Sequence, residues 1–243
     1  MRYIVPNWPV PMSVKSYSST RDGGVSSGPY TDLNLGDHVG DDPAIVDYNR
    51  QNFRRTVGLM NEPHWLTQVH GKEVKVIEQP YSEPVTADAS VTSLKNQACV
   101  IMTADCLPIL LCDKAGTVVA GVHAGWRGLV GGIIKASVLK MNCPPENLMA
   151  WLGPAISQRH FEVGPEVVKA FGADFGAAFK PSERPGHFMA DIYQLARIQL
   201  NRLGISDIYG GDFCTYSDTR FFSYRRDNAV TGRMASLIWI GDR

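Results

Sequence analysis

Apolar and polar positions alternate in short blocks along the chain, and these blocks predict more strands than helices. The middle of the chain is its most apolar part, with near-continuous apolar runs at residues 98–102, 107–112 and 117–123. Runs of this length and composition are typical of strands that are buried on both faces of a sheet. Further strands are expected at residues 148–152, 208–216, 221–224 and 235–240, and two more within residues 65–77, on either side of Gly71.

Helical spacing of apolar residues predicts four helices. The first covers residues 44–59, because Asp42-Pro43 is a typical helix start and Gly58 a typical end. A second, over residues 129–141, follows directly on the tight turn Gly125-Trp-Arg-Gly128. Shorter patterns predict helices over residues 165–171 and 191–203. In the second helix the residues with helical spacing are Ile133, Ile134, Val138 and Leu139. The expected core face of the fourth helix is Ile192, Leu195, Ala196, Gln199 and Leu200.

The order of these elements favours one mixed α/β domain over residues 1–243. Residues 1–43 are rich in Gly, Pro, Ser and Asp and predict short strands and loops. No linker, internal repeat or low-complexity tract divides the sequence. We therefore expect α/β (α+β) architecture with mixed sheets flanked by helices.

Charge and cysteine usage exclude several classes of protein. The 243 residues carry 24 basic and 24 acidic side chains, a net charge of zero, which argues against binding nucleic acid or an anionic membrane. No apolar run reaches the roughly 18 residues of a spanning helix, and Pro6 and Pro9 interrupt the place of a secretory signal. Five scattered cysteines without a CxxC pair do not form a disulfide framework. We expect a cytoplasmic protein.

Three side chains suited to metal binding follow predicted strands: His70, Cys106 and His123. Two His and one Cys form a known catalytic zinc set that leaves a fourth position open. Their spacing matches no local zinc motif, and from residue type alone a core Cys and hydrogen-bonded His are commoner. A second interpretation makes Cys106 a nucleophile with His123 as its base and Asp105 or a backbone carbonyl orienting the ring.

Several polar residues are candidates for binding an anion. Arg127 lies at a helix start, where free backbone N–H groups favour phosphate, although a structural ion pair is an equal alternative. Near the C-terminus, Arg225, Arg226 and Arg233 stand beside aromatic residues, but a solvated or Asp227-paired strand edge is the simpler reading for any single Arg. The N-terminal loop offers Arg21 and Asn34, and an Asn in such a loop more often closes a turn than contacts a ligand.

The joint order of seven motifs is more specific than any one of them. They are Ser19-Thr-Arg-Asp-Gly-Gly-Val25, Leu33-Asn-Leu-Gly36, Gln68-Val-His-Gly71, Thr103-Ala-Asp-Cys-Leu-Pro108, His123-Ala-Gly-Trp-Arg-Gly128, Trp151-Leu-Gly-Pro-Ala-Ile156 and Phe222-Ser-Tyr-Arg-Arg-Asp227. In this order they resemble the bacterial YfiH family, also called the polyphenol oxidase or laccase-domain family, whose members are described as purine nucleoside phosphorylases. The resemblance covers nearly the whole chain.

This resemblance implies a fold, a metal and an activity. The fold is the one shared with cytotoxic-necrotising-factor-like cysteine hydrolases, and the metal is zinc, held by His70, Cys106 and His123, although such a site also accepts copper. The activity is conversion of adenosine, inosine, guanosine or S-methyl-5′-thioadenosine with phosphate to the base and a ribose 1-phosphate, with adenosine deaminase as a side activity. Small-molecule nucleosides and phosphate are thus the expected partners.

The resemblance also suggests roles for residues at the motif positions. His70, Cys106 and His123 are the catalytic candidates together with Asp105, which would manage a proton. Substrate or phosphate binding is expected from Arg21, Asn34, Arg127, Ser223 and Arg225.

Other activities remain open beside the phosphorylase. One is a cysteine amidohydrolase that edits UDP-muramyl peptidoglycan precursors, another is a copper-dependent polyphenol oxidase, and a third is a non-catalytic metal or nucleoside binder. The oxidase has less support, because the six histidines contain no His-x-His pair of the kind that builds multicopper clusters. No pattern in the sequence indicates an oligomeric state.

Overall fold

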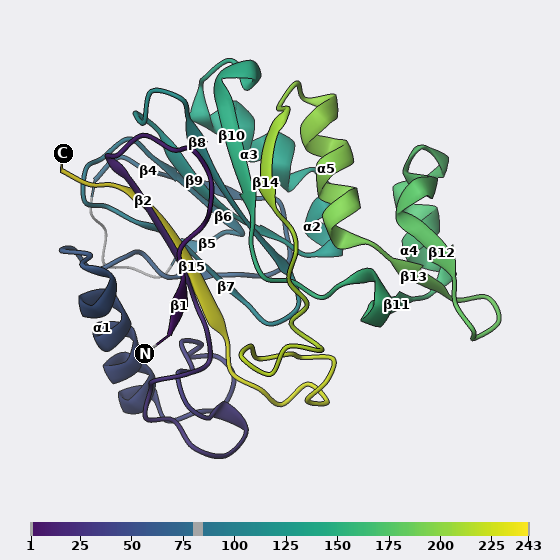
Figure 1. Ribbon diagram of the computed structural model, residues 1–243, viewed down its shortest axis with the longest axis horizontal. Helices are drawn as coiled ribbons and strands as arrows, with labels where there is room; N and C mark the ends of the chain where they lie inside the picture. The colour runs from purple at the N-terminus through teal and green to yellow at the C-terminus, as the bar shows by residue number, and fades with distance from the viewer. Residues whose placement is uncertain (1, 80–84, 243) are drawn as a thin grey trace.

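Two β-sheets packed face to face carry most of the core (Figure 1). The computed structural model describes residues 2–79 and 85–242; residue 1, residues 80–84 and residue 243, which the predicted domain includes, lie outside that description. The mixed α/β arrangement expected from the sequence is confirmed. The predicted likeness to cytotoxic-necrotising-factor-like hydrolases stays a prediction.

The larger sheet has six strands in the order β14-β10-β8-β9-β6-β4. Its three central strands pair antiparallel and are fully buried, which explains their near-continuous apolar sequences. Both edge strands are added in parallel. The bounds are β4 (Val74–Ile77), β6 (Ala89–Thr92), β8 (Leu107–Asp113), β9 (Val119–Ala124), β10 (Leu148–Leu152) and β14 (Asp207–Gly210).

The second sheet is antiparallel and covers one face of the first. Its strand order is β1-β2-β15-β7, and β7 packs across β9. The two sheets approach closely at Gly121, where an added Cβ would lie 3.1 Å from the Ile101 side chain and 3.3 Å from that of Cys99. The bounds are β1 (Tyr3–Ile4), β2 (Val14–Ser19), β7 (Cys99–Thr103) and β15 (Met234–Ile240).

Helices cover the opposite face of the six-stranded sheet and the side of the second one (Figure 1). Helix α1 (Pro43–Val57) begins at Asp42, whose side chain accepts a hydrogen bond from the Ala44 N–H, and ends at Gly58 in the left-handed conformation, as the sequence predicts. Helices α3 and α5 pack against each other and contribute to the main core cluster. The remaining bounds are α2 (Trp126–Gly131), α3 (Ile133–Met141), α4 (Pro165–Phe171) and α5 (Ile192–Arg202).

Smaller elements surround these layers. Helix α4 and a three-stranded sheet form a lobe beside α5 (Figure 1). A two-stranded parallel sheet joins β3 to β5. The strands are β3 (Leu66–Thr67), β5 (Val85–Thr86), β11 (Glu162–Val163), β12 (Phe179–Pro181) and β13 (Phe188–Ala190), and the 3₁₀ turns are η1 (Gly28–Tyr30), η2 (Pro145–Asn147), η3 (Gln158–His160) and η4 (Ala173–Ala178).

Three expectations about elements were wrong. The helix expected over residues 129–141 is two helices, because Gly132 adopts a left-handed φ of 85° between α2 and α3. Leu139 lies on the outer side of α3 and is 68% exposed, whereas Ile133, Ile134 and Val138 are buried. The strand expected over residues 208–216 stops at Gly210, which together with Gly211 has positive φ. Residues 221–224 form turns in place of a strand, closed by hydrogen bonds such as that from the Asp227 N–H to the Ser223 carbonyl.

Two further features bear on the predicted compartment. In the part of the chain that the structure describes, no helix combines the length and the apolar character that crossing a bilayer requires. All five cysteines fall within the described residues, and each is a free thiol.

Candidate metal centre and its pocket

The structure brings His70, Cys106 and His123 together from three separate segments. His70 lies between β3 and β4, Cys106 in the turn between β7 and β8, and His123 in β9. Each offers one ligand atom, and these atoms lie within 4.8 Å of one another; Cys106 Sγ is 3.8 Å from His70 Nε2. The pairing of β8 with β9 places Pro108 opposite His123 and so holds the Cys106 turn beside the imidazole. The three residues singled out in the sequence therefore form one cluster.

The local backbone is shaped to aim these side chains inward. His70 and Asp105 have positive φ values of 60° and 87°, which non-glycine residues adopt at a cost of about 1–3 kcal/mol each. Gly125, directly after β9, leaves room for the ligands: a Cβ there would lie 3.1 Å from both Cys106 Sγ and His70 Cδ2. Such crowding and strain are typical of a functional site.

Asp88, which belongs to none of the sequence motifs, is the residue that holds this cluster in place. Its fully buried carboxylate accepts a hydrogen bond from His123 Nδ1 at 2.8 Å and others from the N–H groups of Val69, His70 and Gly71. In the sequence Asp88 is a single acidic residue between Ala87 and Ala89, which no motif distinguishes. Asp88 thus orients both the imidazole of His123 and the loop that carries His70.

The electrostatics of the cluster favour a thiolate beside an imidazolium. Burial opposes ionisation of Cys106, but the charge of His123 and hydrogen bonds from His123 and His70 outweigh it and lower the thiol pKa to about 6. Burial also opposes the charged form of His123, yet Cys106 and Asp88 raise its pKa to about 9. Burial likewise opposes the charge of Asp88, and the donated hydrogen bonds hold its pKa below the usual range. The other strand cysteines, Cys99 and Cys112, have pKa values raised by burial to about 11 and 12.

The donor set fits a zinc-type metal. Ligand atoms in a tetrahedral site with bonds of 2.0–2.3 Å lie about 3.3–3.8 Å apart, so the observed spread requires small side-chain movements. The thiol ionises readily, and His123 Nδ1 donates a hydrogen bond to Asp88. Nε2 is therefore the nitrogen available to a metal, which would bind there by displacing the Nε2 proton of the imidazolium. The three residues could therefore hold one ion and leave a position open toward the pocket.

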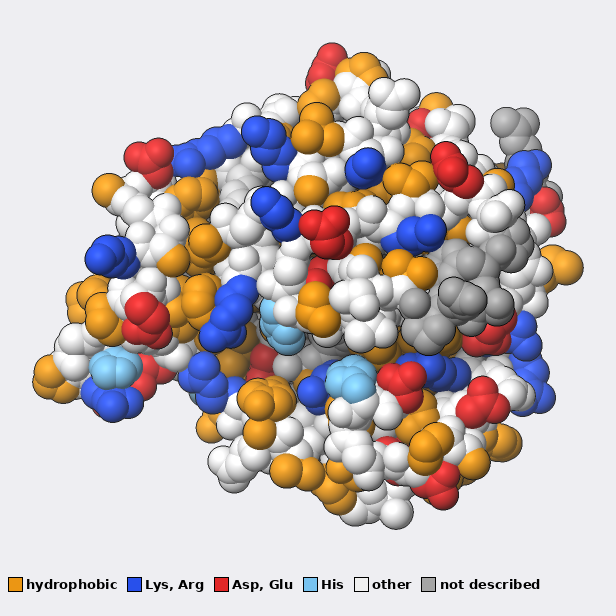
Figure 2. Space-filling model, turned by 180° about the vertical axis from the view of Figure 1, so that it is seen from behind, with side chains coloured by type: hydrophobic (Ala, Val, Ile, Leu, Met, Phe, Trp, Pro, Cys, Tyr) orange, Lys and Arg blue, Asp and Glu red, His pale blue; other side chains and the backbone are white. Residues whose placement is uncertain are grey.

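A pocket of about 560 Å³ opens over this cluster, a volume in the range of small-ligand sites. Figure 2 shows His side chains beside Lys and Arg side chains at a hollow in this face of the molecule. Apolar and aromatic groups make up much of the remaining wall. The lining residues are His38, Gln68, His70, Met102, Thr103, Ala104, Asp105, Cys106, His123, Trp126, Arg127, Ile156, Phe161, Ile192, Tyr224, Arg225 and Arg233.

Two of the five residues expected to bind substrate or phosphate line this pocket. Arg127 is exposed at its rim with its guanidinium 4.3 Å from the Trp126 ring centroid. Arg225 is also exposed, and its Nη1 donates to the Glu162 carbonyl at 2.9 Å. Both are placed to meet an anionic group of a ligand.

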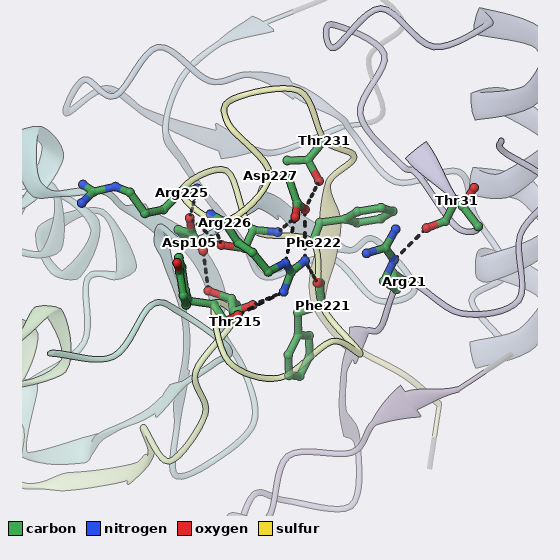
Figure 3. A network of polar contacts seen from close by, with 12 residues as sticks. Arg21, Thr31, Asp105, Thr215, Phe221, Phe222, Arg225, Arg226, Asp227 and Thr231 are labelled. Atoms are coloured by element: carbon green, nitrogen blue, oxygen red, sulfur yellow. Dashed lines mark hydrogen bonds and ion pairs between the residues drawn. The ribbon is translucent and has the colours of Figure 1, made fainter. Parts of the chain in front are cut away.

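Asp105 anchors the C-terminal loop to the pocket wall (Figure 3). Its carboxylate accepts hydrogen bonds from Thr215 Oγ1 at 2.6 Å, Ser223 Oγ at 3.1 Å and the Arg225 N–H at 2.7 Å. Ser223 is fully buried by this contact and does not line the pocket. The carboxylate hydrogen-bonded to His123 is that of Asp88, so the expected orienting role of Asp105 falls to another residue.

Arg21 and Asn34 lie outside the pocket lining. Arg21 Nε donates to the Thr31 carbonyl, and its guanidinium lies 4.7 Å from the Phe222 ring centroid (Figure 3). Asn34 is fully buried and closes a turn: its Oδ1 accepts from the Gly36 N–H and its Nδ2 donates to the Gly36 carbonyl. Neither side chain lines the pocket, so a role of Arg21 and Asn34 in binding substrate stays a prediction.

The C-terminal arginines divide between structure and pocket. Arg226 pairs with Asp227 and donates to the carbonyls of Thr215 and Phe221, so it is a structural residue (Figure 3). Arg233 faces the pocket, together with His38, which the sequence analysis did not single out.

Comparisons with known proteins agree in family and fold. Residues 15–241 match the family described as multi-copper polyphenol oxidoreductase laccase. The chain is 52% identical to the Pseudomonas aeruginosa protein named purine nucleoside phosphorylase PA4543, across 99% of both chains. It is 51% identical to the Escherichia coli protein named purine nucleoside phosphorylase YfiH, across 98% of this chain and 99% of that one. The crystal structure of Neisseria meningitidis protein NMB0706 superposes with a TM-score of 0.95 at 47% identity and covers 100% of both chains.

Proposed function

This chain belongs to the multi-copper polyphenol oxidoreductase laccase family, and from that premise we propose that it is a metal-dependent purine nucleoside phosphorylase. The resemblance of its motifs to the YfiH family is confirmed by relatives that share about half of its residues and carry that activity in their names. We propose zinc as the metal and adenosine deamination as a side activity of the same site.

The observation that carries this proposal is the meeting of three features in one pocket. The pocket has a volume of about 560 Å³, and three kinds of group line it. These are the candidate metal ligands, arginine side chains that form no ion pair with a described carboxylate, and apolar side chains. A nucleoside and a phosphate need all three: a surface for the flat purine, cations for the phosphate, and an electrophile near the bond that breaks.

In phosphorolysis, a phosphate oxygen bonds to ribose C1′ while the bond from C1′ to the purine nitrogen breaks. The electron pair of that bond goes to the purine, which takes up one proton. Arg127 and Arg225 can attract anionic groups at the rim of the pocket by charge-assisted hydrogen bonds, and the aromatic rings of Trp126 and Phe161 can pack on the purine or ribose. Asp105 supports this arrangement by holding the Arg225 backbone.

His70, Cys106 and His123 would hold the metal. The chemistry that zinc supplies when bound there is Lewis acidity toward a substrate atom. Asp88 keeps His123 in the tautomer that presents Nε2 to the ion. The protein's own contribution is thus to orient the ligands and to keep the site partly dry.

Purified protein incubated with inosine and phosphate tests the proposal. We expect ribose 1-phosphate and hypoxanthine from zinc-replete protein, and loss of both products after chelation or in Cys106→Ala. No ribose 1-phosphate from protein that contains one zinc per chain would overturn the proposal. Replacing inosine by adenosine, without phosphate, tests the deaminase activity through release of ammonia.

A cysteine hydrolase is the second candidate, and a specific geometry favours it. Thiol hydrolases use a nucleophile, a base and a carboxylate that orients the base, and the matching residues here are Cys106, His123 and Asp88. The low thiol pKa, about 6, suits a nucleophile as well as a ligand. A UDP-muramyl peptide precursor is the substrate that we would test.

The two candidates respond in opposite ways to chelation. Amide hydrolysis by a Cys106 thiolate should survive removal of metal and stop on alkylation of Cys106. Hydrolysis that disappears with the metal would count against the thiol nucleophile. Copper-dependent polyphenol oxidation has less support, because the described residues contain one group of metal-ligand candidates, whereas multicopper oxidation needs several metal ions.

A further inference from the structure

Arg233 is a cation that faces the pocket without an acidic partner. It lies directly before β15 and lines the same cavity as the His70, Cys106 and His123 cluster. No carboxylate of the described residues forms an ion pair with it, whereas Arg226 and Arg220, in the same C-terminal segment, are paired with Asp227 and Asp218. Arg233 is therefore free to bind an anion.

The side chain of Arg233 is held in one position. Its backbone N–H donates to Asn34 Oδ1 at 2.9 Å, and its Nη1 donates to the carbonyls of Thr231 at 2.9 Å and Gly232 at 3.0 Å. The aliphatic part of the Arg233 side chain packs directly against Gly36, where a Cβ would lie only 2.7 Å from Arg233 Cγ. Within the described residues, Nε and Nη2 have no hydrogen-bond acceptor, so two donors stay available.

The setting of Arg233 differs from that of the other pocket arginines. Arg127 and Arg225 are exposed, and ion pairs at exposed side chains are weak because water and salt screen the charges. Arg233 is partly buried, and desolvation lowers its pKa although Cys106, Tyr224 and Asp105 act in the opposite direction. A partly desolvated cation without a counter-charge binds an anion more strongly than a fully hydrated one.

His38 extends the same end of the pocket. It is exposed, lines the cavity, and the nearby charge of Arg233 contributes to lowering its pKa after desolvation. Its Nδ1 contacts Asp37 at 3.4 Å, which leaves Nε2 for a ligand. The partly buried guanidinium of Arg233 and the exposed imidazole of His38 thus line the same end of the pocket.

We propose that Arg233 is the residue that binds the phosphate co-substrate, with His38 beside it, so that Arg127 and Arg225 serve the outer part of the pocket. This inference rests on the proposed phosphorolysis. The guanidinium offers Nε and Nη2 to two phosphate oxygens, an arrangement that suits a planar two-donor group. Because Arg233 is fixed before the ligand arrives, little conformational entropy is lost on binding.

The kinetics of Arg233→Met distinguish a role in phosphate binding from a general role in keeping the pocket folded. The KM for phosphate at saturating inosine should rise about 10- to 100-fold, the loss expected for a charged hydrogen-bonded partner. The KM for inosine at saturating phosphate should change less than about threefold, because the nucleoside contacts remain. Arg220→Met is the matched control, since Arg220 is an exposed arginine of the same segment that does not line the pocket.

Arg233→Lys is a second, more conservative variant, which keeps the test decisive if Arg233→Met does not fold. It keeps the charge and much of the stem but loses the planar fork, so we expect a phosphate KM between those of wild type and Arg233→Met. Zinc content and the melting temperature of each variant show whether the fold and the metal site persist. A phosphate KM unchanged in both variants, with a rise in Arg127→Met or Arg225→Met, overturns the inference.

Direct binding of inorganic phosphate distinguishes failure of this inference from failure of the proposed function. Calorimetric titration of zinc-loaded protein without nucleoside should show phosphate binding that Arg233→Met weakens about tenfold or more. Binding with this pattern but without turnover of inosine would reject the phosphorylase and keep the anion site. Turnover in wild type together with phosphate binding that is equal in wild type and Arg233→Met would keep the phosphorylase and reject the role of Arg233. Acetate, titrated in parallel, should bind more weakly; preference for acetate would contradict a phosphate site.

Discussion

At the scale of single residues, one carboxylate organises two of the three candidate metal ligands. Asp88 accepts from His123 Nδ1 and from three consecutive backbone N–H groups around His70. An amide at this position presents an NH₂ group to donors that need an acceptor. We therefore expect Asp88→Asn to weaken zinc affinity about 10- to 100-fold, measured by competition with a chromophoric chelator.

Asp113 provides the matched control for this substitution. It is also buried and accepts hydrogen bonds from Thr117 and Val118, but it lies at the far end of β8 from Cys106. Asp113→Asn should lower the melting temperature and leave zinc affinity unchanged. Equal zinc affinity in Asp88→Asn and wild type would show that the ligands need no help from this carboxylate.

The cysteines should differ strongly in reactivity once the metal is removed. The Cys106 pKa is lowered to about 6, so its thiolate dominates above that pH and is lost as the pH falls through it. Burial raises the pKa of Cys99 to about 11 and that of Cys112 to about 12, which keeps both protonated near pH 7. Iodoacetamide at pH 7.5 should label Cys106 first, and below pH 6 the rate should fall by about tenfold per pH unit.

Peptide mapping by mass spectrometry reads out this prediction. Cys143 is the internal reference, because it is partly exposed but has a raised pKa. Added zinc should protect Cys106 and leave the labelling of Cys143 unchanged. A Cys106 that reacts no faster than Cys143 at pH 7.5 would contradict the assigned ionisation.

At the scale of elements, the site depends on a close approach at the junction of β9 and α2. Gly125 lies at this junction, and a Cβ there would be 3.1 Å from Cys106 Sγ and from His70 Cδ2. Two ligands would have to move together to relieve the contact. Gly125→Ala should thus weaken zinc affinity at least about tenfold, with a smaller effect on the melting temperature than on metal binding.

Gly131, at the end of the same helix, is the control for that substitution. An added Cβ would lie 3.7 Å from the Lys72 Cβ, which is ordinary contact distance. Because alanine favours a helix over glycine by about 0.5–1 kcal/mol, Gly131→Ala should be neutral or slightly stabilising and keep full zinc affinity. Similar metal binding in Gly125→Ala and Gly131→Ala would remove the steric argument.

At the scale of the whole molecule, metal binding should stabilise the fold. The ligands come from segments before β4, between β7 and β8 and within β9, so an ion would join both main sheets. Zinc at 100 times its dissociation constant adds about 2.7 kcal/mol to the free energy of unfolding. For a chain of this size the melting temperature should rise by about 5–10 °C, measured by scanning calorimetry of chelated and reloaded protein.

Cys106→Ala isolates the site from general effects of zinc. This variant keeps the fold and lacks one ligand, so its melting temperature should respond little to zinc or to chelator. An equal rise in wild type and Cys106→Ala would place the stabilising ion elsewhere.

The elements that were predictable from sequence are those with strong local signals. Helix α1 follows from Asp42-Pro43 and Gly58, and strands β8, β9 and β10 follow from apolar runs. Two of the three errors fall where a single glycine conformation decides, at Gly132 between α2 and α3 and at Gly210 after β14, and the third is the strand expected over residues 221–224. A positive φ depends on the packing around a residue, and the periodicity of apolar residues in the sequence does not predict it.

The same distinction holds for the candidate site: residues with a local signal were predicted, and residues whose role depends on tertiary contacts were not. His70, Cys106 and His123 were identified because their residue types bind metals and each follows a predicted strand, and the structure places them within 4.8 Å. Asp88 was missed because its role depends on β6 lying beside β9. Arg21 and Asn34 were expected from the motif resemblance, but they lie outside the pocket lining, where Arg21 Nε donates to the Thr31 carbonyl and Asn34 closes a turn.

By itself, the sequence determined the α/β class, the apolar strands, the scattered cysteines that argue against a disulfide framework, and the chemical types gathered at the site. These features follow from local composition and spacing. Only the tertiary structure decided which carboxylate contacts His123 and which arginines line the pocket. Those contacts join residues as distant as Asn34 and Arg233, and strand order with register, which local sequence does not encode, sets them.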